Sequence, residues 1–400
     1  MSWRDTFRAL RHRNYRLFFA GQIISLVGTW MQNVAVSWLV YRLTQSELIL
    51  GVTAFCSNIA VFVLGPVGGV AADRYSRYRI LLLAQWLSMF QALALAALTL
   101  SGKVSVASIL ALAAVLGVIN AFEIPARQSL VVHLASKEDL FSAISLNSAM
   151  FNAARVIGPS LAGVLVAAVG EGWCFVFNAI SFLAVIGCLL AMRLPPWEEP
   201  PGEHPWERLR GGIDYVRHSK PVRSVLILMS AATFSLMPVM VLAPVFAEGI
   251  FHKGVAGFGA LTGAFGVGAV AGTLALAHTG KHESLPRLIF LSTSGLAVSL
   301  ALFAAAPSFS AALVILFALG FCVLRQNASA NTYIQTIVPD AFRGRIMAFY
   351  SMTVVGMSPF ASLAAGALAE RVGARLTIAC GSALSLSAAL SFRYVMKVKG

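Results

Sequence analysis

The stretch RVIGPSLAGVLVAAVG, residues 155–170, is matched about 200 residues later by VVGMSPFASLAAGALAERVG, residues 354–373. Each stretch carries a glycine, a proline and a second glycine in the same order, namely Gly158, Pro159 and Gly163 in the first and Gly356, Pro359 and Gly366 in the second. The runs that precede them, QSLVVHLASKEDLFSAIS and NTYIQTIVPDAFRGRIMAFYS, also correspond. A duplicated apolar chain predicts two similar helical bundles, and transporters bind their cargo between such halves.

The composition is that of a protein that crosses the membrane many times. Of 400 residues, 58% are hydrophobic and only 12% are charged, and the mean hydropathy is +0.80. A soluble domain does not need that much apolar surface. Twelve apolar stretches are long enough to span a bilayer, at about 17–41, 48–71, 80–101, 104–124, 141–169, 173–194, 223–247, 255–279, 287–306, 308–333, 345–369 and 373–395.

One substantial polar segment, residues 195–222, divides the chain into two halves. We therefore expect a bundle of six helices in 1–194 and a second bundle of six in 223–400. Within the linker, apolar residues recur at helical spacing over 205–218, which predicts a helix lying on the cytoplasmic face of the membrane. The chain has no GxxxxGK[ST] motif for a nucleotide, which disfavours transport driven by ATP within this chain.

The net charge of +14 follows the membrane topology. With twelve spans and the N-terminus inside, 23 of the 30 Lys and Arg residues fall on the cytoplasmic side and five on the other side. This asymmetry predicts that both termini are cytoplasmic, and it removes the reason to expect a nucleic-acid partner. The five cysteines are scattered along or near the spans, so we expect neither a disulfide nor a metal site. We also expect no cofactor.

The loop between the second and third apolar stretches is GGVAADRYSRYR, residues 68–79. It resembles the signature loop of the major facilitator superfamily, and Gly69, Asp73, Arg74 and Arg77 match that signature. Ala71 and Ser76, among others, depart from it. Gly69 is expected to permit close helix approach, and Asp73 to face the positive N-terminus of a neighbouring helix. The resemblance implies a gating role for Asp73, Arg74 and Arg77; an ordinary solvated turn is the alternative.

The segment Ala154–Gly163 is similar to the exporter-associated motif of this superfamily, with alanine at two glycine positions. Small residues also suit plain helix packing, so the motif only favours export. Three further strings, at 25–46, 123–131 and 327–351, closely resemble the bacterial exporter branch of transmembrane secretion effector type, which includes the exporter of the siderophore enterobactin.

This resemblance implies an all-α fold of twelve helices in two pseudo-symmetric bundles, in the bacterial inner membrane. It further implies alternating-access efflux of a small amphipathic molecule by a monomer among membrane lipids, with protons as the coupling ion. Import or flipping of a lipid-like substrate, such as a lysophospholipid, is an open alternative. A receptor or an enzyme is a more remote one, because no nucleophile–base pair or metal cluster stands out.

Polar residues recur every three to four positions along the first apolar stretch. In a membrane helix such a stripe faces either a wet cavity or a partner helix. First spans line the central path in this superfamily, so we expect a substrate cavity lined by these side chains, with hydrogen bonding between helices as the alternative: Gln22, Ser25, Thr29, Gln32 and Asn33.

Glu123 lies near the cytoplasmic end of the fourth apolar stretch, four residues before Arg127. Desolvation raises the pKa of a carboxylate and a nearby cation lowers it, so such a group can load and release a proton as access alternates. Our hypothesis is that Glu123 couples transport to protons with Arg127 as its switching partner. A static ion pair at the helix end is the alternative.

Two further arginines lie within apolar stretches. Arg155 follows Asn147 and Asn152 in the fifth, and Arg325 lies in the tenth at almost the repeat-related position of Glu123. An inter-half ion pair, recognition of an anionic cargo, or snorkelling of Arg325 towards the inner leaflet would each account for them. We expect the cavity to include six further side chains, listed from both halves: Asn147, Asn152, Arg155, Met237, Arg325 and Asn331.

Overall fold

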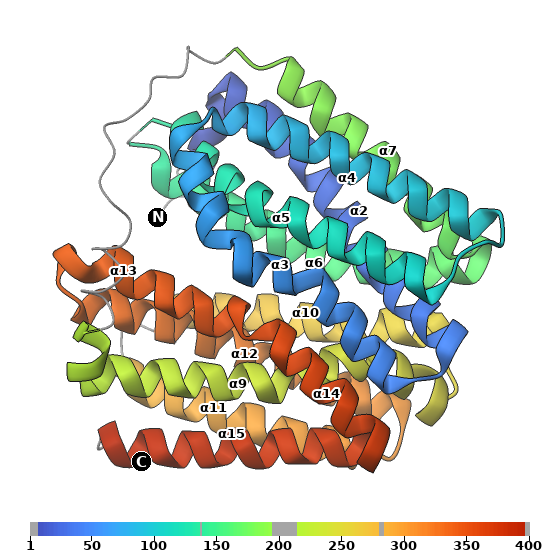
Figure 1. Cartoon of the computed structure of the whole chain (residues 1–400). Helices are drawn as coiled ribbons and strands as arrows, with labels where there is room; N and C mark the ends of the chain where they lie inside the picture. Colours follow the sequence, from blue (N-terminus) through green and yellow to red (C-terminus); the bar gives the residue numbers. More distant parts are fainter. Residues whose placement is uncertain (1–6, 137, 194–213, 280–283, 397–400) are drawn as a thin grey trace. The chain divides into compact units, whose positions relative to one another are not determined.

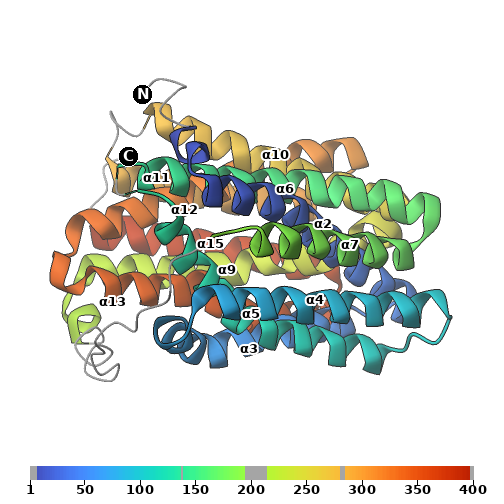
Figure 2. The ribbon, with the colours of Figure 1, turned by 90° about the horizontal axis from the view of Figure 1, so that it is seen from above.

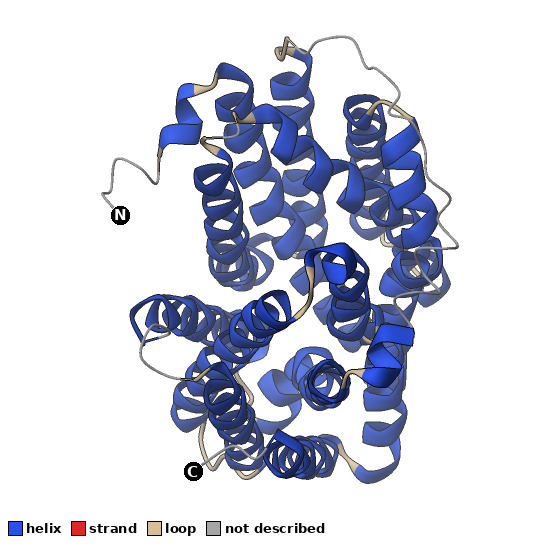
Figure 3. Ribbon diagram, turned by 90° about the vertical axis from the view of Figure 1, so that its left-hand side faces the viewer, coloured by secondary structure: helices blue, strands red, loops and turns tan. Residues whose placement is uncertain are grey.

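The computed structural model describes residues 7–136, 138–193, 214–279 and 284–396 (Figure 1). Every regular element in these ranges is a helix (Figure 3). Twelve of the helices are long and apolar enough to cross a membrane. The predicted all-α architecture with twelve spans is therefore confirmed, while the cytoplasmic placement of the termini stays a prediction.

The chain divides into two compact units, and one helix belongs to both. Unit 1 comprises Met1–Gln45 and Cys56–Pro201, and unit 2 comprises Ser46–Phe55 and Gly202–Gly400. Helix α3, Glu47–Arg74, begins in unit 2 and continues in unit 1. The predicted linker helix lies mostly outside the described residues, although 214–218 are helical.

In unit 1, α2 packs against both α6 and α7, and α4 packs against α5 and α7 (Figure 2). Tyr15, Leu81 and Leu189 are fully buried in a core that gathers residues from several of these helices. Besides α3, the elements of this unit are η1 (Arg8–Arg11), α2 (Arg13–Thr44), α4 (Arg77–Leu100), α5 (Val106–Leu134), α6 (Leu140–Val169) and α7 (Glu171–Leu190).

In unit 2, α15 packs against α9 and α11, and α10 packs against α12. The first turns of α3 lie on α14, where Gly51 and Gly366 face each other and Glu370 accepts a hydrogen bond from the Leu48 backbone. The elements are α9 (Lys220–Val245), η2 (Phe246–Ile250), α10 (Gly254–Thr279), α11 (Leu285–Ala304), α12 (Phe309–Ile337), α13 (Asp340–Ser351), η3 (Met352–Gly356), α14 (Ser358–Val372) and α15 (Ala374–Met396).

The internal repeat is visible in the helix ends. Ser105 caps α5 and Ser308 caps α12, 203 positions later, and both helices have 29 residues. Gly170 and Gly373, also 203 positions apart, each form a one-residue link to the next helix, with φ of 86° and 85°. Only glycine adopts that backbone region without strain, which explains why both repeats end their fifth span in this residue.

The two halves of the repeat differ at their fifth span. Helix α6 runs without a break, whereas its counterpart consists of α13, the π-helical η3 and α14. The residues that precede these helices, Asp139 and Pro339, are 200 positions apart instead of 203. A π-helical turn accommodates extra residues within a helix. The second repeat therefore has a shorter loop and a longer, irregular span.

Candidate functional site

Glu123 and Arg127 form a buried ion pair on one face of α5. Arg127 Nε donates to Glu123 Oε1 at 2.8 Å, and the two residues are only 7% and 8% exposed. The spacing of four residues places both side chains on the same face of a helix. The Arg127 guanidinium also lies 4.4 Å from the centre of the Phe151 ring on α6. The structure thus brings the two predicted partners together and adds an aromatic contact.

Arg155 lies one turn beyond Phe151 on α6, and its guanidinium is 5.5 Å from the centre of the Trp30 ring on α2. Gly158 makes this contact possible, because a Cβ there would come within 2.5 Å of Trp30 Cβ and 2.9 Å of the Val27 carbonyl oxygen. The small-residue motif of this helix therefore serves close packing of α6 on α2. Arg155 Nε is buried and has no hydrogen-bond partner among the described residues.

Gln32 belongs to a chain of buried amides that crosses unit 1. Its Nε2 donates to Gln91 Oε1 at 3.0 Å, and its Oε1 accepts from Asn178 Nδ2 at 2.8 Å. Gln91 in turn donates to the Leu112 carbonyl oxygen of α5, and Ser181 donates to Asn178. For Gln32, which is 2% exposed, these contacts correspond to the alternative of hydrogen bonding between helices.

The remaining predicted residues of α2 differ in their surroundings. Gln22 and Ser25 are buried, and Gln22 Oε1 has no hydrogen-bond partner within the described part of the chain. Thr29 is half-buried and Asn33 is exposed. Of the five stripe residues, Gln22, Ser25 and Gln32 are thus buried and Asn33 alone is exposed, and the lining of a substrate cavity by the stripe stays a prediction.

The signature loop joins the end of α3 to the start of α4. Arg77 Nε donates to the Ala72 carbonyl oxygen, and Arg77 Nη1 contacts the ring of His133 at the end of α5. Asp73 and Arg74 are exposed. In this loop Arg77 is therefore the residue that ties three helix ends together.

One expectation for this loop was wrong. Gly69 has open space where a Cβ would lie, so it does not mediate close helix approach. Gly68 does so instead, since a Cβ there would lie 2.0 Å from the Ala121 carbonyl oxygen of α5. Successive residues of a helix point about 100° apart, so a shift of one position moves the contact to another face.

The predicted residues of unit 2 do not gather around one described contact. The Arg325 guanidinium lies 5.9 Å from the centre of the Phe321 ring of its own helix. Asn331 Oδ1 accepts from Gln335 Nε2, and Met237 is half-buried. Gln326, which lies 203 positions after Glu123, is its repeat counterpart; Arg325 is one position away. In unit 1, Asn152 bonds to the Ser148 carbonyl oxygen of its own helix.

The sequence reasoning missed four partners of the predicted residues: Trp30, Gln91, Phe151 and Asn178. Each one contacts a predicted residue through a ring or an amide. Gln91 and Asn178 carry a usable signal, because an amide in an apolar span needs a partner. Trp30 and Phe151 carry none, because aromatic residues are common in any membrane helix.

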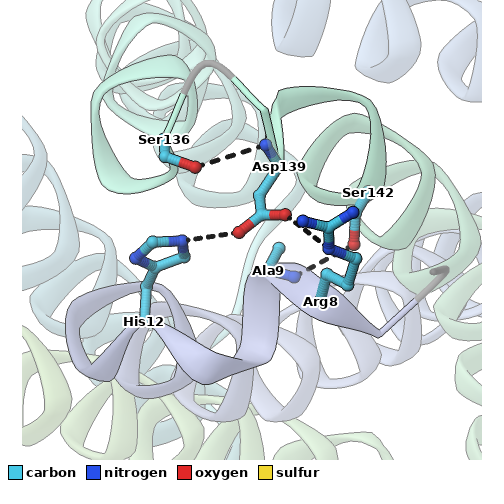
Figure 4. A network of polar contacts seen from close by, with 6 residues as sticks. All are labelled: Arg8, Ala9, His12, Ser136, Asp139 and Ser142. Carbon is cyan, nitrogen blue, oxygen red and sulfur yellow. Dashed lines mark hydrogen bonds and ion pairs between the residues drawn. The ribbon is translucent and has the colours of Figure 1, made fainter. Parts of the chain in front are cut away.

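A second polar network lies where the chain enters α6 (Figure 4). Asp139 forms an ion pair with Arg8 at 3.1 Å and accepts a hydrogen bond from His12 Nε2 at 2.9 Å. The Ala9 backbone N–H donates to Ser142 Oγ. These contacts fix η1 against the start of α6. The hydrogen bond from His12, with the charge of Arg8, holds the pKa of Asp139 below its usual range.

Two repeated bundles of membrane-spanning helices, with ionisable and amide side chains buried among the spans, define a transporter of the major facilitator superfamily. Within it, the chain belongs to the family of transmembrane secretion effectors, whose family profile matches residues 4–399. This confirms the resemblance drawn from the sequence. The chain is a multi-pass protein of the bacterial inner membrane, and it is a transporter rather than an enzyme.

Two relatives match over most of the chain. The staphyloferrin A transporter of Staphylococcus aureus is 25% identical over 363 residues, which are 90% of this chain and 90% of that protein. The enterobactin exporter EntS of Shigella boydii is 29% identical over 360 residues, which are 89% of this chain and 85% of that protein.

Solved structures confirm the fold. A bacterial homologue of the iron transporter ferroportin, in an inward-facing state, matches with a TM-score of 0.71 at 17% identity, over 96% of this chain and 98% of that one. The nucleoside transporter NupG matches with a TM-score of 0.74 at 13% identity, over 98% of this chain and 100% of that one.

Proposed function

We propose that this protein exports a small amphipathic molecule of the siderophore class across the inner membrane and that protons drive the export. Relatives that match nearly the whole chain are named as a siderophore exporter and a siderophore transporter, which supports the cargo class. The word exporter in one of these names, together with the exporter-like segment Ala154–Gly163, favours export over import. The working unit is taken to be a monomer surrounded by membrane lipids.

The observation that carries proton coupling is the ion pair of Glu123 and Arg127. A carboxylate buried in a membrane helix is stable when a cation neutralises it, and it takes up a proton when that cation moves away. Arg127 holds Glu123 through one hydrogen bond of 2.8 Å and also stacks on Phe151. The pair can therefore separate by a rotation of the Arg127 side chain, with the Phe151 ring still beneath the guanidinium.

The repeat supports this assignment. At the positions equivalent to Glu123 and Arg127, α12 carries Gln326 and Ala330, which do not titrate. Only the first of the two equivalent helices thus has a buried acid–base pair at this level. A proton-coupled cycle needs one group that is charged in one state and neutral in another, and we assign this role to Glu123.

The test uses protein reconstituted into liposomes, with the cargo enterobactin on one side and an imposed pH gradient. Wild-type transport is expected to accelerate with the gradient, whereas Glu123→Gln is expected to transport at the same rate with or without it. Glu171→Gln is the matched control, because Glu171 is also a buried carboxylate paired with an arginine, Arg42. It should keep the response to the gradient.

The outcomes separate the parts of the proposal. A full response of Glu123→Gln to the gradient would contradict the coupling role of this residue. Transport of lysophospholipid but not of enterobactin would instead replace the cargo class by a lipid-like one. If enterobactin accumulated on the cytoplasmic side in both directions of the imposed pH gradient, the proposal of export would have to be replaced by import.

A further inference from the structure

Arg155 places a positive charge among the helices of unit 1. It lies within the membrane-spanning part of α6, where a charge is costly unless it is paired or hydrated. Among the described residues no carboxylate forms an ion pair with it, whereas Arg8, Arg42 and Arg127 each have one. The contact that the structure gives its guanidinium is the Trp30 ring.

The surroundings of the Arg155 guanidinium are aromatic and apolar. Trp30 packs on a small apolar core made of Leu26, Met150 and Ala154. Gly158 lets α2 approach α6 closely enough for the Trp30 ring to lie beside the guanidinium. An arginine stacked on an aromatic ring keeps its N–H edge available for a planar anion, because the ring occupies the face of the group.

A second unfilled polar group lies on the same face of α6. Asn147, Phe151 and Arg155 follow at intervals of four residues, so they form one line along the helix. Asn147 Oδ1 is buried without a hydrogen-bond partner in the described residues, as is Arg155 Nε. The two residues are about 12 Å apart along the helix axis. At one end of this face the acceptor Asn147 Oδ1 has no hydrogen-bond partner among the described residues, and at the other end the donor Arg155 Nε has none. Phe151 lies between these two residues along the helix.

We propose that this face of α6 binds the anionic group of the cargo, with Arg155 as the residue that recognises its charge. A carboxylate or a similar planar anion would accept hydrogen bonds from the guanidinium, and a hydroxyl or amide N–H elsewhere on the molecule would donate to Asn147. The inference deepens the proposed transport function by stating the charge of the cargo, and it rests on that function for the statement that the bound molecule is cargo.

The alternative is that Arg155 only joins α6 to α2 through Trp30. The two accounts differ in what they predict for ligands that differ only in charge. A joining role predicts that loss of Arg155 weakens every ligand equally, through a change in the helix packing. A recognition role predicts that the loss affects the anion alone.

The test measures binding of two matched probes, 7-methoxycoumarin-3-carboxylate and its carboxamide, to the purified full-length protein in lipid nanodiscs by equilibrium dialysis. Hydrogen bonds to a charged group stabilise a complex by about 1.5–3 kcal/mol, so the wild type should bind the acid roughly tenfold or more tightly than the amide. Arg155→Met should bring that ratio close to one and leave the affinity for the amide unchanged.

Further variants complete the design. Arg155→Lys should keep part of the preference, because it retains the charge but loses the planar fork. Ser160→Ala is the matched control on the same helix, since Ser160 is exposed and bonds only to the Val156 carbonyl oxygen in the contacts described. Arg155→Gln, which keeps a polar side chain without charge, replaces Arg155→Met if that variant does not fold in size-exclusion chromatography.

Three results would overturn the inference: no preference for the acid in the wild type, a preference that survives in the folded uncharged variant, or equal weakening of acid and amide. Failure of the proposed transport function would give a different set of results. In that case the wild type would prefer the acid in nanodiscs but move neither the probe nor enterobactin across liposomes.

Discussion

Helices α5 and α12 occupy equivalent positions in the two repeats and share most of their features, but they differ at the positions where we propose a function. Each has 29 residues, each begins after a capping serine, and each is followed by a residue of extended backbone conformation. The difference lies in the third quarter of the helix, where α5 carries Glu123 and Arg127 and α12 carries Gln326 and Ala330. The common features are those that a membrane helix needs in order to form and pack. The charged pair is not one of them.

The largest expected effect comes from removing one residue of the ion pair between Glu123 and Arg127, which distinguishes α5 from α12. Arg127→Ala leaves the buried carboxylate of Glu123 without its cation, which typically costs about 3–5 kcal/mol. The double variant Glu123→Gln/Arg127→Ala gives α5 the residues of α12 and should recover most of that loss. Thermal and denaturant unfolding in detergent measure both. Equal destabilisation of the single and double variants would show that the charge pairing is not what stabilises this part of α5.

The next largest effect concerns the glycines at equivalent positions of the two helices, Gly117 and Gly320. A Cβ at Gly320 would lie 2.0 Å from the Phe265 carbonyl oxygen of α10, and a Cβ at Gly117 would lie 2.7 Å from the Ser57 carbonyl oxygen of α3. Backbone atoms cannot move away cheaply, so Gly320→Ala should lower stability by about 1–3 kcal/mol and Gly117→Ala by less.

Gly187→Ala is the control for these two variants. It lies within α7 with open space at the Cβ position, so alanine should be neutral or stabilising by about 0.5–1 kcal/mol through helix propensity. Unfolding midpoints in one detergent rank the three variants. A smaller loss for Gly320→Ala than for Gly117→Ala would mean that the α10–α12 contact is looser than described.

A smaller effect on stability is expected from the N-terminal caps of α5 and α12. Ser105 Oγ accepts from the Ser108 backbone N–H, and Ser108 Oγ accepts from the Ser105 backbone N–H. In α12, Ser308 accepts from the Ala311 backbone N–H, and Ala311 has no hydroxyl to return the bond. Ser105→Ala should therefore cost about 1 kcal/mol and more than Ser308→Ala, whereas Ala311→Ser should gain a fraction of that by completing the box. Hydrogen exchange of the first turn of each helix measures this, and unchanged protection in Ala311→Ser would contradict the account.

The contrast between the two repeats also explains how far the sequence could be interpreted alone. The number of spans follows from hydropathy, because a membrane imposes both the length and the apolar character of each helix. The ion pair of Glu123 and Arg127 follows from spacing within one helix. Both properties are local, so they can be predicted from a single stretch of sequence.

What could not be predicted depends on the facing helix. The choice of Gly68 over Gly69 for close approach depends on where α5 lies. The pairing of Gln32 with Gln91 and Asn178 depends on the rotation of three helices relative to one another. The exact register of the repeat required the helix ends, since the η3 turn shifts part of the alignment by three residues. Hydropathy and residue spacing carry no information about how neighbouring helices are rotated or shifted relative to one another.

The smallest expected effect concerns a contact of the first repeat, the attachment of η1 through Asp139. Folding lowers the pKa of Asp139, through the hydrogen bond from His12 and the charge of Arg8, below the usual value of about 3.9. The attachment is therefore complete at neutral pH and is lost as the pH falls below about 4, through the lowered pKa. Hydrogen exchange of Arg8–Arg11 at pH 7 and pH 3 should show loss of protection in acid. Asp139→Asn should show that loss already at pH 7, while Glu138→Gln, which removes the neighbouring exposed charge, should behave as the wild type. Full protection of Asp139→Asn at pH 7 would mean that apolar packing of Ala9 and Tyr15, rather than the polar network, holds η1 in place.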